Sequence, residues 1–380
     1  MTTVEIAGIG LHPFGRFDGV SVTDMGVVAV RAALADAGIG AHDRPGFQAA
    51  FCGTAYSGVA AGHKVLGALA RTGMPIVDIE AGCASGGAAL GLAAGAIRAG
   101  QYDTVLVFGM EKMPKGIIRS SFFEPWREAS GLAATPAYFA LRAQRLMRER
   151  GITKQDLARV VVKNRAHGAL NPDAMYQTET TIEAVLESRV VCDPLHLFML
   201  CSPNEGAAAV VLRRAASGST AVRLDAAVLR SHLPGSVLGE ATPLAGIDDA
   251  NITPPTTLAA DAAYAEAGIG PDDVDIVECQ DTDAARELLG WEELGLCAPG
   301  DQARILAAGD ASLGGARPIN PSGGLLSKGE PLGASALGQV VELTRQLRGT
   351  AGPRQVDGVM VALAHTVGRG ANASVTILSR

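Results

Sequence analysis

Alternating apolar and amphipathic segments run through the first part of the chain and set the order of its expected elements. Short apolar runs that end at glycine predict strands over residues 4–9 and 47–52, and helical periodicity predicts helices over residues 24–37 and 63–71. This alternation favours a mostly parallel sheet covered by helices. The stretch 78–110 then reads as strand, sharp turn, Ala/Leu-rich helix and a second buried strand.

The pattern changes over residues 113–206, where Pro, Lys, Arg, Phe, Trp and Glu interrupt the apolar alternation. An amphipathic helix is predicted over residues 135–150, and the polar stretch 164–181 is expected to form a loop. Long insertions on an α/β core commonly carry binding loops. We therefore expect this insertion to form a separate loop region, with His167 and Tyr176 as weak candidates for substrate contacts.

The rest of the chain returns to the core pattern and repeats part of it. A Gly-rich turn followed by an Ala/Leu/Gly helix occurs at Cys83 and again at Glu330. This similarity predicts two pseudo-equivalent halves with Cys83 and Glu330 at matching helix starts. We expect the first half to comprise residues 1–112 and 207–222 and the second half to comprise residues 223–380. Further strands are predicted over residues 207–213, 221–231, 274–279, 359–364 and 373–378.

Cys83 is the strongest candidate for chemistry, because it lies where a strand ends and a long helix begins. Unpaired N–H groups and the helix dipole at a helix start favour the thiolate, which is the nucleophilic form of cysteine. The small residues beside it, Gly82 and Ala84-Ser85-Gly86-Gly87, allow a substrate or another backbone to approach closely. A buried structural cysteine is the alternative, but the turn and its glycines favour a nucleophile.

Composition excludes several other classes of protein. The 380 residues are 48% hydrophobic but only 4% aromatic and include 47 glycines, which is typical of a tightly packed α/β protein. A net charge of −7 without a basic tract gives nucleic-acid binding no electrostatic support. Six scattered cysteines without a CxxC pair predict neither a metal site nor disulfides. With no signal-peptide pattern and no long apolar run, we expect a soluble cytoplasmic protein without a membrane span.

Several motifs together resemble the thiolase superfamily, and the resemblance covers essentially the whole chain. Residues 82–86, Gly-Cys-Ala-Ser-Gly, are similar to the family's nucleophile motif, and residues 320–333 are similar to its NxxGGxxxxGHPxGA segment. Residues 366–370 lie where the family has CxGxG, and residues 199–209 are similar to the stretch after the insertion. The chain is most similar to the sterol-carrier-protein or lipid-transfer-type thiolases, in which a histidine, here His365, precedes a turn without its cysteine.

The resemblance implies a five-layer αβαβα fold, a homodimer, and an acyl-CoA acyltransferase that works through a cysteine thioester. The implied reaction is the CoA-dependent cleavage of a 3-oxoacyl-CoA, or the reverse Claisen condensation. Coenzyme A would be a co-substrate, and no cofactor would stay bound. Some relatives also work with a small subunit that has a zinc ribbon and an OB fold, so such a partner is a further expectation.

Three departures from the family pattern leave open which residues act as acid and base. The histidine of GHP is Glu330 here, the second cysteine of CxGxG is Thr366, and the NEAF or HDCF motif falls at residues 280–283, Gln-Asp-Thr-Asp. Glu330 can act as a general base only with a pKa raised by burial, and a helix N-cap is its alternative role. His365 is the other candidate acid or base, or a hydrogen-bonded histidine of the core.

The remaining site candidates are hydrogen-bond donors for the oxyanion that forms when a thiolate attacks a carbonyl. Gln280 can donate through its amide, as Asn does in the family pattern. A backbone N–H from the turn at Gly368 or Gly370 can act together with the N–H of Cys83.

Two other functions stay open on the sequence alone. One is a retro-aldol carbon–carbon lyase acting on an acyl-CoA with a steroid-type side chain, a reaction that has no use for the Cys83 nucleophile. The other is a non-catalytic acyl-CoA or lipid-binding protein of the same fold, which the altered acid–base residues favour. The retained nucleophile motif argues against both, so acylation of Cys83 discriminates between the three.

Overall fold

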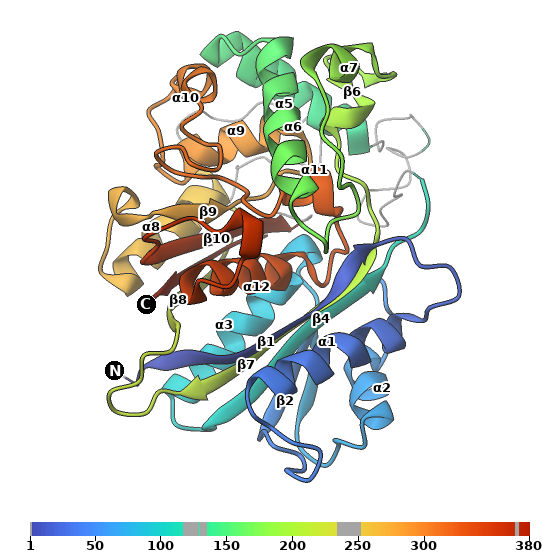
Figure 1. Ribbon diagram of the computed structural model, residues 1–380, viewed down its shortest axis with the longest axis vertical. Helices are drawn as coiled ribbons and strands as arrows, with labels where there is room; N and C mark the ends of the chain where they lie inside the picture. The colour runs from blue at the N-terminus through green and yellow to red at the C-terminus, as the bar shows by residue number, and fades with distance from the viewer. Residues whose placement is uncertain (1, 117–128, 130–134, 234–251, 369–371) are drawn as a thin grey trace.

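The computed structural model describes residues 2–116, 129, 135–233, 252–368 and 372–380. Gly370, one of the expected oxyanion positions, lies outside these residues. A nine-stranded sheet forms the core of the molecule (Figure 1). Its two parts are joined between β1 and β8 at the residue pair Glu5–Arg223, and we call them the first and the second sheet.

The first sheet has the strand order β3-β2-β4-β7-β1. Strands β3, β2 and β4 are parallel, as the strand–helix alternation predicted, whereas β7 and β1 run antiparallel to their neighbours. The second sheet has the order β8-β11-β10-β9, with only β9 and β10 parallel. The bounds are β1 Val4–Gly15, β2 Ala49–Gly53, β3 Ile76–Ile79, β4 Thr104–Lys112, β7 Glu205–Arg214, β8 Arg223–Ser231, β9 Ile276–Glu278, β10 Val361–Gly368 and β11 Asn372–Ser379.

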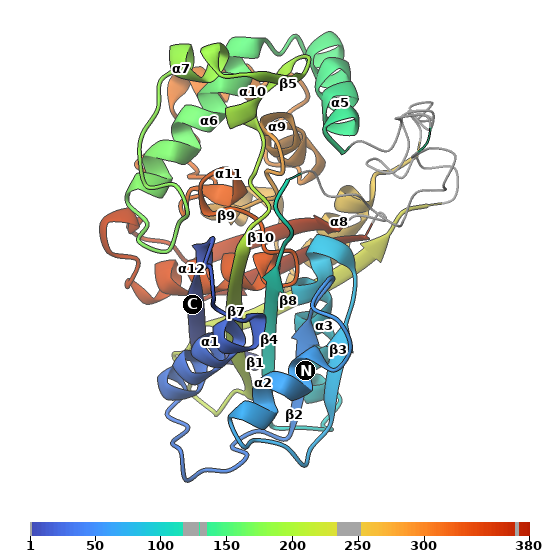
Figure 2. The ribbon, with the colours of Figure 1, turned by 90° about the vertical axis from the view of Figure 1, so that its right-hand side faces the viewer.

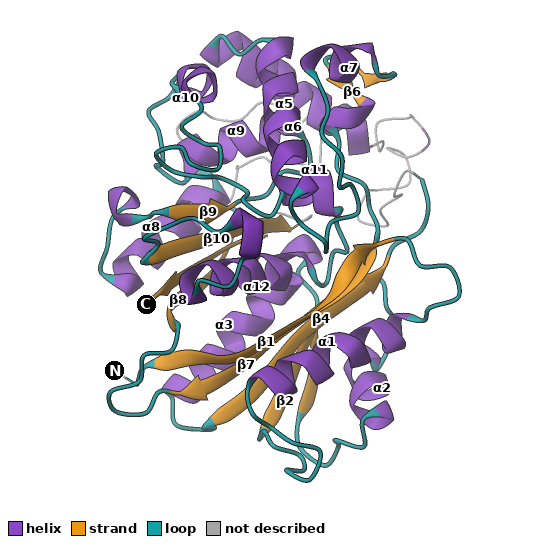
Figure 3. Ribbon diagram, viewed as in Figure 1, coloured by secondary structure: helices purple, strands orange, loops and turns teal. Residues whose placement is uncertain are grey.

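Helices cover the outer faces of both sheets and also fill the space between them (Figures 1 and 3). Helices α1 (Val22–Asp36) and α2 (Ala61–Ala68) pack on the first sheet, and α8 (Pro255–Ala267) packs on the second sheet beside α9 (Ala284–Glu293). Helix α3 (Ser85–Arg98) contacts β2, β4 and β8, and α12 (Ser335–Arg348) contacts β7 and β10. The expected five-layer αβαβα fold is therefore confirmed.

The two halves repeat one strand pattern, which explains the internal sequence similarity. Strands β4, β7 and β1 of the first sheet correspond in order and direction to β10, β11 and β8 of the second. The parallel pair β2–β4 corresponds to β9–β10, and Ile319 bridges Val277 in parallel where the first sheet has β3. Helix α3 follows β3 and helix α12 follows Ile319, so the two central helices are topologically equivalent.

The insertion gathers at one end of the molecule, as the two perpendicular ribbon views agree (Figures 1 and 2). It contains α5 (Thr135–Arg150), α6 (Lys154–Ala169), α7 (Ile182–Glu187), β5 (Val190–Cys192) and β6 (Leu195–His196). Two helices from the second half, α10 (Gln302–Ala308) and α11 (Gly324–Lys328), pack against α6. The division of the chain into two halves and a loop region at the boundaries given above stays a prediction.

The expected loop over residues 164–181 is wrong in its first part, because α6 continues to Ala169. Thr153 and Asp156 start this helix with a reciprocal capping box. Its polar residues Lys163 and Asn164 are buried against the second half rather than solvated. Sequence polarity therefore indicated a loop where the structure has a helix that buries hydrogen-bonded polar groups.

The turn before α12 is in direct backbone contact with the first sheet through glycine. A Cβ atom on Gly333 would lie 2.6 Å from the carbonyl oxygen of Gly53 and 2.7 Å from that of Met110. A Cβ on Gly109 would lie 2.0 Å from the carbonyl oxygen of Gly333. These distances leave no room for a side chain, so the glycines allow the second half to approach the ends of β2 and β4.

We expect Gly333→Ala to lower the free energy of unfolding by about 1–3 kcal/mol, because the added methyl group overpacks this contact. Urea denaturation followed by circular dichroism measures the change. Gly95→Ala is the matched control, since Gly95 is an exposed residue of α3 with no atom within 4 Å of the added Cβ. The control should be unchanged or more stable by about 0.5–1 kcal/mol. Equal stability of the two variants would show that the contact is not tight.

Candidate active site

Cys83 lies at a sharp turn between β3 and α3, where the sequence predicted it. A short 3-10 turn, η1 (Gly82–Ala84), leads directly into the helix. Gly82 has φ 61°, a left-handed conformation that glycine adopts without strain. Ser85 stabilises the turn, because its Oγ accepts a hydrogen bond from the Ala81 N–H at 2.9 Å and donates to the Gly82 carbonyl at 2.6 Å. The chain is thus held with Cys83 at the helix start.

One side of the Cys83 side chain is apolar. It packs against Met113, which follows β4, and against Leu332 in the turn before α12, with Ala55 at the edge. The Ala55 N–H donates to the Glu111 carboxyl at 2.8 Å, and burial raises the pKa of Glu111. Both halves of the fold therefore contribute side chains to the surroundings of Cys83, which is 7% exposed.

A polar cluster centred on Glu330 lies beside this region, and we call Gln280, Cys201 and Glu330 the Glu330 cluster. The Gln280 amide donates to Glu330 Oε1 at 2.9 Å, and the Cys201 thiol donates to Glu330 Oε2 at 3.2 Å. The Glu330 backbone N–H also donates to the Ser202 carbonyl at 2.9 Å. Glu330 is not the N-cap of α12, because that helix starts at Ser335, five residues later.

Cys201 is the residue of this cluster that sequence reasoning missed. Burial raises the pKa of the Cys201 thiol well above its usual value, and the negative charge of Glu330 raises it further. Cys83 also acts electrostatically on this pKa, so the two sulfur-bearing side chains are neighbours. Cys201 is therefore a protonated thiol near the candidate nucleophile. Its only signal in the sequence was its place in residues 199–209, which resemble a family segment.

Gln280 joins the cluster from the carboxyl end of β9. The side chain is fully buried, and its Oε1 has no hydrogen-bond partner in the part of the chain that the structure describes. Its amide nitrogen is oriented by Glu330, which leaves one N–H of the amide for another acceptor. This arrangement keeps Gln280 available as an oxyanion donor.

Buried carboxylates that follow β9 hold the Gly-rich segment that leads to Glu330. Asp281 accepts hydrogen bonds from the N–H groups of Leu325 and Leu326 at 2.7 and 3.1 Å, and Glu278 accepts from Lys328 at 3.2 Å. Burial and the nearby Glu287 raise the pKa of Asp281 well above its usual value. Asp281 therefore caps α11 rather than the helix that follows it.

Asp283 has a structural role at the start of a helix. It is the N-cap of α9, and its carboxylate accepts a hydrogen bond from the Arg286 N–H at 3.0 Å. Its carboxylate is also paired with Arg142 of the insertion. It therefore has structural contacts on both sides and is not a catalytic acid.

The structure does not bring His365 to Cys83, so its expected role as acid or base is corrected. Successive side chains of a strand point to opposite faces. His365 points towards α8, where its Nε2 lies 3.1 Å from Thr256 Oγ1, and burial lowers its pKa well below the usual value. Thr366 points towards α12 instead and donates to Gln339 Oε1 at 3.0 Å. His365 is thus a neutral residue of the outer core.

Gly368 is next to the turn that holds Cys83. A Cβ atom on Gly368 would lie 2.0 Å from the Ala81 carbonyl oxygen and 3.3 Å from the Ala84 side chain. The backbone of β10 therefore reaches the Cys83 turn, and no other residue type fits there. This position is compatible with the oxyanion role that the sequence suggested for the backbone of this turn.

His167 has a structural role, and its expected contact with substrate is wrong. Its Nε2 accepts a hydrogen bond from the Leu313 N–H at 3.0 Å, so Nδ1 carries the proton and donates to the Asn320 carbonyl at 2.9 Å. Burial lowers the pKa of His167 to about 3, so the ring is neutral. Tyr176 differs, because it is partly exposed and its ring lies 3.9 Å from the guanidinium carbon of Arg165.

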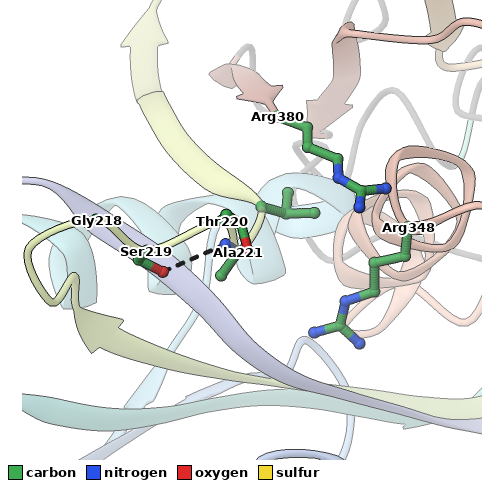
Figure 4. Close-up of a pocket in the computed structure, with 7 residues that line it drawn as sticks. Gly218, Ser219, Thr220, Ala221, Arg348 and Arg380 are labelled. Atoms are coloured by element: carbon green, nitrogen blue, oxygen red, sulfur yellow. Dashed lines mark hydrogen bonds between the residues drawn. The ribbon is translucent and has the colours of Figure 1, made fainter.

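The described residues contain no group of three His, Cys, Asp or Glu side chains arranged to hold a metal ion. None of the helices in the described ranges is long and apolar enough to cross a membrane. A surface pocket of about 510 Å³ lies at the connection between β7 and β8 and is lined by residues 218–222, Arg348 and Arg380 (Figure 4). It includes none of the candidate residues, so it does not belong to this site.

Comparison with known proteins agrees with these features. The profile described as Thiolase, N-terminal domain matches residues 4–216, and Thiolase C-terminal domain-like matches residues 243–380. The benzoylsuccinyl-CoA thiolase subunit BbsB of Thauera aromatica is 36% identical over 98% of this chain and 96% of its own. Sterol carrier protein 2 of Gallus gallus is 34% identical over 98% of this chain and 71% of its own.

A third relative, the acetyl-CoA acetyltransferase of Methanothermobacter thermautotrophicus, is 34% identical over the full length of both chains. Among solved structures, the Ltp2-ChsH2(DUF35) aldolase has a TM-score of 0.84 and 26% identity, over 99% of this chain and 97% of its own. A monomeric SCP2-thiolase like protein from Mycobacterium smegmatis, at 21% identity and a TM-score of 0.75, shares the fold over 99% of this chain and 77% of its own. The chain belongs to the thiolase family.

Proposed function

We propose that this chain catalyses thiolase-type acyl transfer, in which Cys83 forms a thioester with the acyl group of an acyl-CoA. The observation that carries the proposal is the placement of Cys83 at the start of α3, next to the Glu330 cluster. A thiolate at a helix start is favoured by the dipole and by free N–H groups. The names of the thiolase and acetyltransferase relatives support the same reaction class.

In the cleavage direction, the Cys83 thiolate attacks the 3-oxo carbon of a 3-oxoacyl-CoA. The bond between C2 and C3 breaks, the acyl group stays on sulfur, and the carbanion left at C2 takes a proton to give acetyl-CoA. The thiol of a second coenzyme A then attacks the thioester, gives up its proton, and releases the shortened acyl-CoA. The reverse sequence is the Claisen condensation, and the chain needs no bound cofactor for either direction.

The Glu330 cluster supplies the proton transfers in this scheme. Cys201 is a neutral thiol hydrogen-bonded to a carboxylate, so it can protonate the C2 carbanion and be reprotonated through Glu330. Glu330 accepts this proton from the thiol of the incoming coenzyme A and passes it to the Cys201 thiolate. The Gln280 amide and the N–H groups of Cys83 and Gly368 would stabilise the oxyanions. Cys201 thereby takes the task of the family cysteine that Thr366 replaces.

A retro-aldol carbon–carbon cleavage of an acyl-CoA is the second candidate. It is favoured by the structural similarity to the Ltp2-ChsH2(DUF35) aldolase. The two reactions differ in whether the enzyme becomes acylated, because a retro-aldol cleavage forms no thioester with Cys83. Acylation of the Cys83 sulfur is therefore the measurement that distinguishes the two reactions.

We expect wild-type protein mixed with a panel of acyl-CoA thioesters to gain the mass of one acyl group, and Cys83→Ala to gain none. The reason is that the adduct requires the Cys83 sulfur. Intact-protein mass spectrometry measures both. Cys297→Ala is the control, since Cys297 is a partly buried thiol that lies outside the site, and this variant should still be acylated on Cys83. Absence of an adduct with every donor in the wild type would exclude the thiolase mechanism and leave the aldolase and binding-protein readings.

We expect Cys201→Ser and Glu330→Gln to separate the two half-reactions. With an acyl-CoA donor, Cys201→Ser should still form the adduct on Cys83, because this exchange creates no carbanion, whereas Glu330→Gln should form it more slowly. Steady-state turnover of both variants should fall by about 10²–10⁴-fold, because proton transfer to and from the substrate is impaired. Intact-protein mass spectrometry measures acylation of Cys83, and a steady-state assay measures turnover. Cys192→Ser is the control outside the cluster. If both variants retain full turnover, the Glu330 cluster does not transfer protons.

We also propose that the chain forms a homodimer and works with acyl-CoA, coenzyme A and, as some relatives do, a small zinc-ribbon subunit. Strand β3 lies at the edge of the first sheet, and its Val77 is 43% exposed, as is Leu92 of the following helix α3 at 55%. Exposed edge strands with apolar residues favour pairing with another chain.

The six described cysteines are all free, which fits a reducing cytoplasm.

We expect light scattering to give twice the chain mass of 38.8 kDa for the wild type and a monomer for Val77→Lys. A lysine at this edge would place like charges opposite each other across the interface. Lys154→Met, a change at an exposed site of α6 away from β3, serves as the control and should remain dimeric. A monomeric wild type would contradict the dimer but leave the acyl-transfer chemistry unaffected.

A further inference from the structure

Arg165 of α6 is a buried cation without a counter-ion. It is 8% exposed, its Nε has no hydrogen-bond partner, and no ion pair to it occurs in the described ranges. No carboxylate is among the groups that act on its pKa. Every other buried Lys or Arg of the described residues has an anionic or carbonyl partner: Arg71, Lys163, Arg286, Lys328 and Arg354. Arg165 is thus the exception within this part of the chain.

An unpaired guanidinium is expensive to bury. The group carries five N–H donors and keeps its positive charge in proteins. The ring of Tyr176 lies 3.9 Å from the guanidinium carbon, and that of Phe198 lies 5.8 Å from it. Aromatic faces attract the cation, but they leave the buried Nε–H without an acceptor. A ligand with anionic oxygen atoms would complete this site, whereas a neutral ligand would leave the charge unbalanced.

The surroundings of Arg165 are connected to the candidate active site. Phe198 belongs to the short turn η2 (Leu197–Met199), which comes just before Cys201. The N–H of Tyr176 donates to the Ser327 carbonyl at 2.9 Å, in the helix that precedes Glu330. Met175, next to Tyr176, contacts the Asn204 amide through its sulfur. Phe198 therefore lies on the segment that carries Cys201, and Tyr176 is hydrogen-bonded to the helix that leads to Glu330.

We propose that Arg165 binds an anionic oxygen group of the acyl-CoA substrate, either a carboxylate within the acyl group or a phosphate of coenzyme A. The planar guanidinium suits both, because it donates two parallel hydrogen bonds to a carboxylate or a phosphate. The rings of Tyr176 and Phe198 pack against the guanidinium. The proposal deepens the proposed function, since it names a chemical feature of the substrate of the same site.

Equilibrium binding tests the proposal without any turnover. Calorimetry in the Cys83→Ala background compares succinyl-CoA, butyryl-CoA, coenzyme A and pantetheine. The acyl carboxylate is present only in succinyl-CoA, and pantetheine lacks all the phosphate groups of coenzyme A together with the adenosine. Arg165→Met removes the cation, Arg165→Lys keeps the charge, and Arg159→Met removes an exposed cation from the same helix.

If the acyl carboxylate is the ligand, Arg165→Met should weaken succinyl-CoA binding by about 10–100-fold and leave butyryl-CoA unchanged. If a phosphate is the ligand, the same variant should weaken all three CoA compounds alike and leave pantetheine unchanged. In both cases Arg165→Lys should retain part of the affinity and Arg159→Met all of it. Unchanged binding of all four probes by a folded Arg165→Met protein would overturn the proposal.

Two measurements keep the test decisive. Thermal unfolding shows whether each variant is folded. If Arg165→Met does not fold, the affinities of the wild type for the four probes test the proposal. Equal affinity for succinyl-CoA and butyryl-CoA, together with equal affinity for coenzyme A and pantetheine, would refute anion recognition. Binding is measured apart from acylation of Cys83. Failure of the proposed acyl transfer therefore shows as a missing adduct with intact CoA binding, whereas failure of this inference shows as a missing dependence on Arg165.

Discussion

The contact between the starts of the two central helices, made by glycine backbones, is the constraint on which the site depends. Helices α3 and α12 lie between two sheets, so their first turns can meet only if the segments before them approach at backbone distance. Gly333 lies against Gly53 and Gly109, and Gly368 lies against the turn before Cys83. Because no side chain separates these segments, Cys83 from the first half and Leu332 from the second half are in contact.

Buried charge holds the second half of the site in place. Glu278 and Asp281, which flank the end of β9, accept hydrogen bonds from the Gly-rich segment that runs from Ser322 to Lys328. Glu287 accepts from Asn320 at 2.8 Å and pairs with Lys163 at 2.9 Å. Removing one member would leave its partner buried and unsatisfied, which is more costly than the bond itself is stabilising. This network therefore fixes the segment before Glu330, so that Glu330 is held by buried hydrogen bonds rather than carried on a free loop.

Glu330 changes the electrostatics of the site relative to the family pattern. A histidinium beside a thiolate would stabilise the negative charge, whereas a carboxylate raises the pKa of a neighbouring thiol. The Cys201 thiol shows this effect, since burial and, in addition, the Glu330 charge raise its pKa well above the usual value. The cluster is consequently suited to donating and accepting protons, while stabilisation of the Cys83 thiolate relies on the start of α3.

Local sequence was sufficient for the features that depend on neighbouring residues. The strand–helix alternation, the turn of Gly82 and Cys83 at the start of a helix, and the repeated Gly-rich turn at Glu330 all follow from propensity, periodicity and glycine conformations over a few residues. The internal repeat also predicted two equivalent halves, the family resemblance implied five layers, and the structure has both.

The side-chain partners in the site were decided only by the tertiary structure, because hydrogen bonds and charge pairs join residues that are far apart in the chain. Cys201 and Glu330 are separated by 129 positions, and no local pattern pairs them. His365 and Thr366 are adjacent, yet strand geometry sends one to α8 and the other to α12. Arg165 appears in the sequence as one more polar residue of the insertion. Only packing shows that it is buried without a counter-ion in the described structure, since burial depends on what surrounds a side chain rather than on its type.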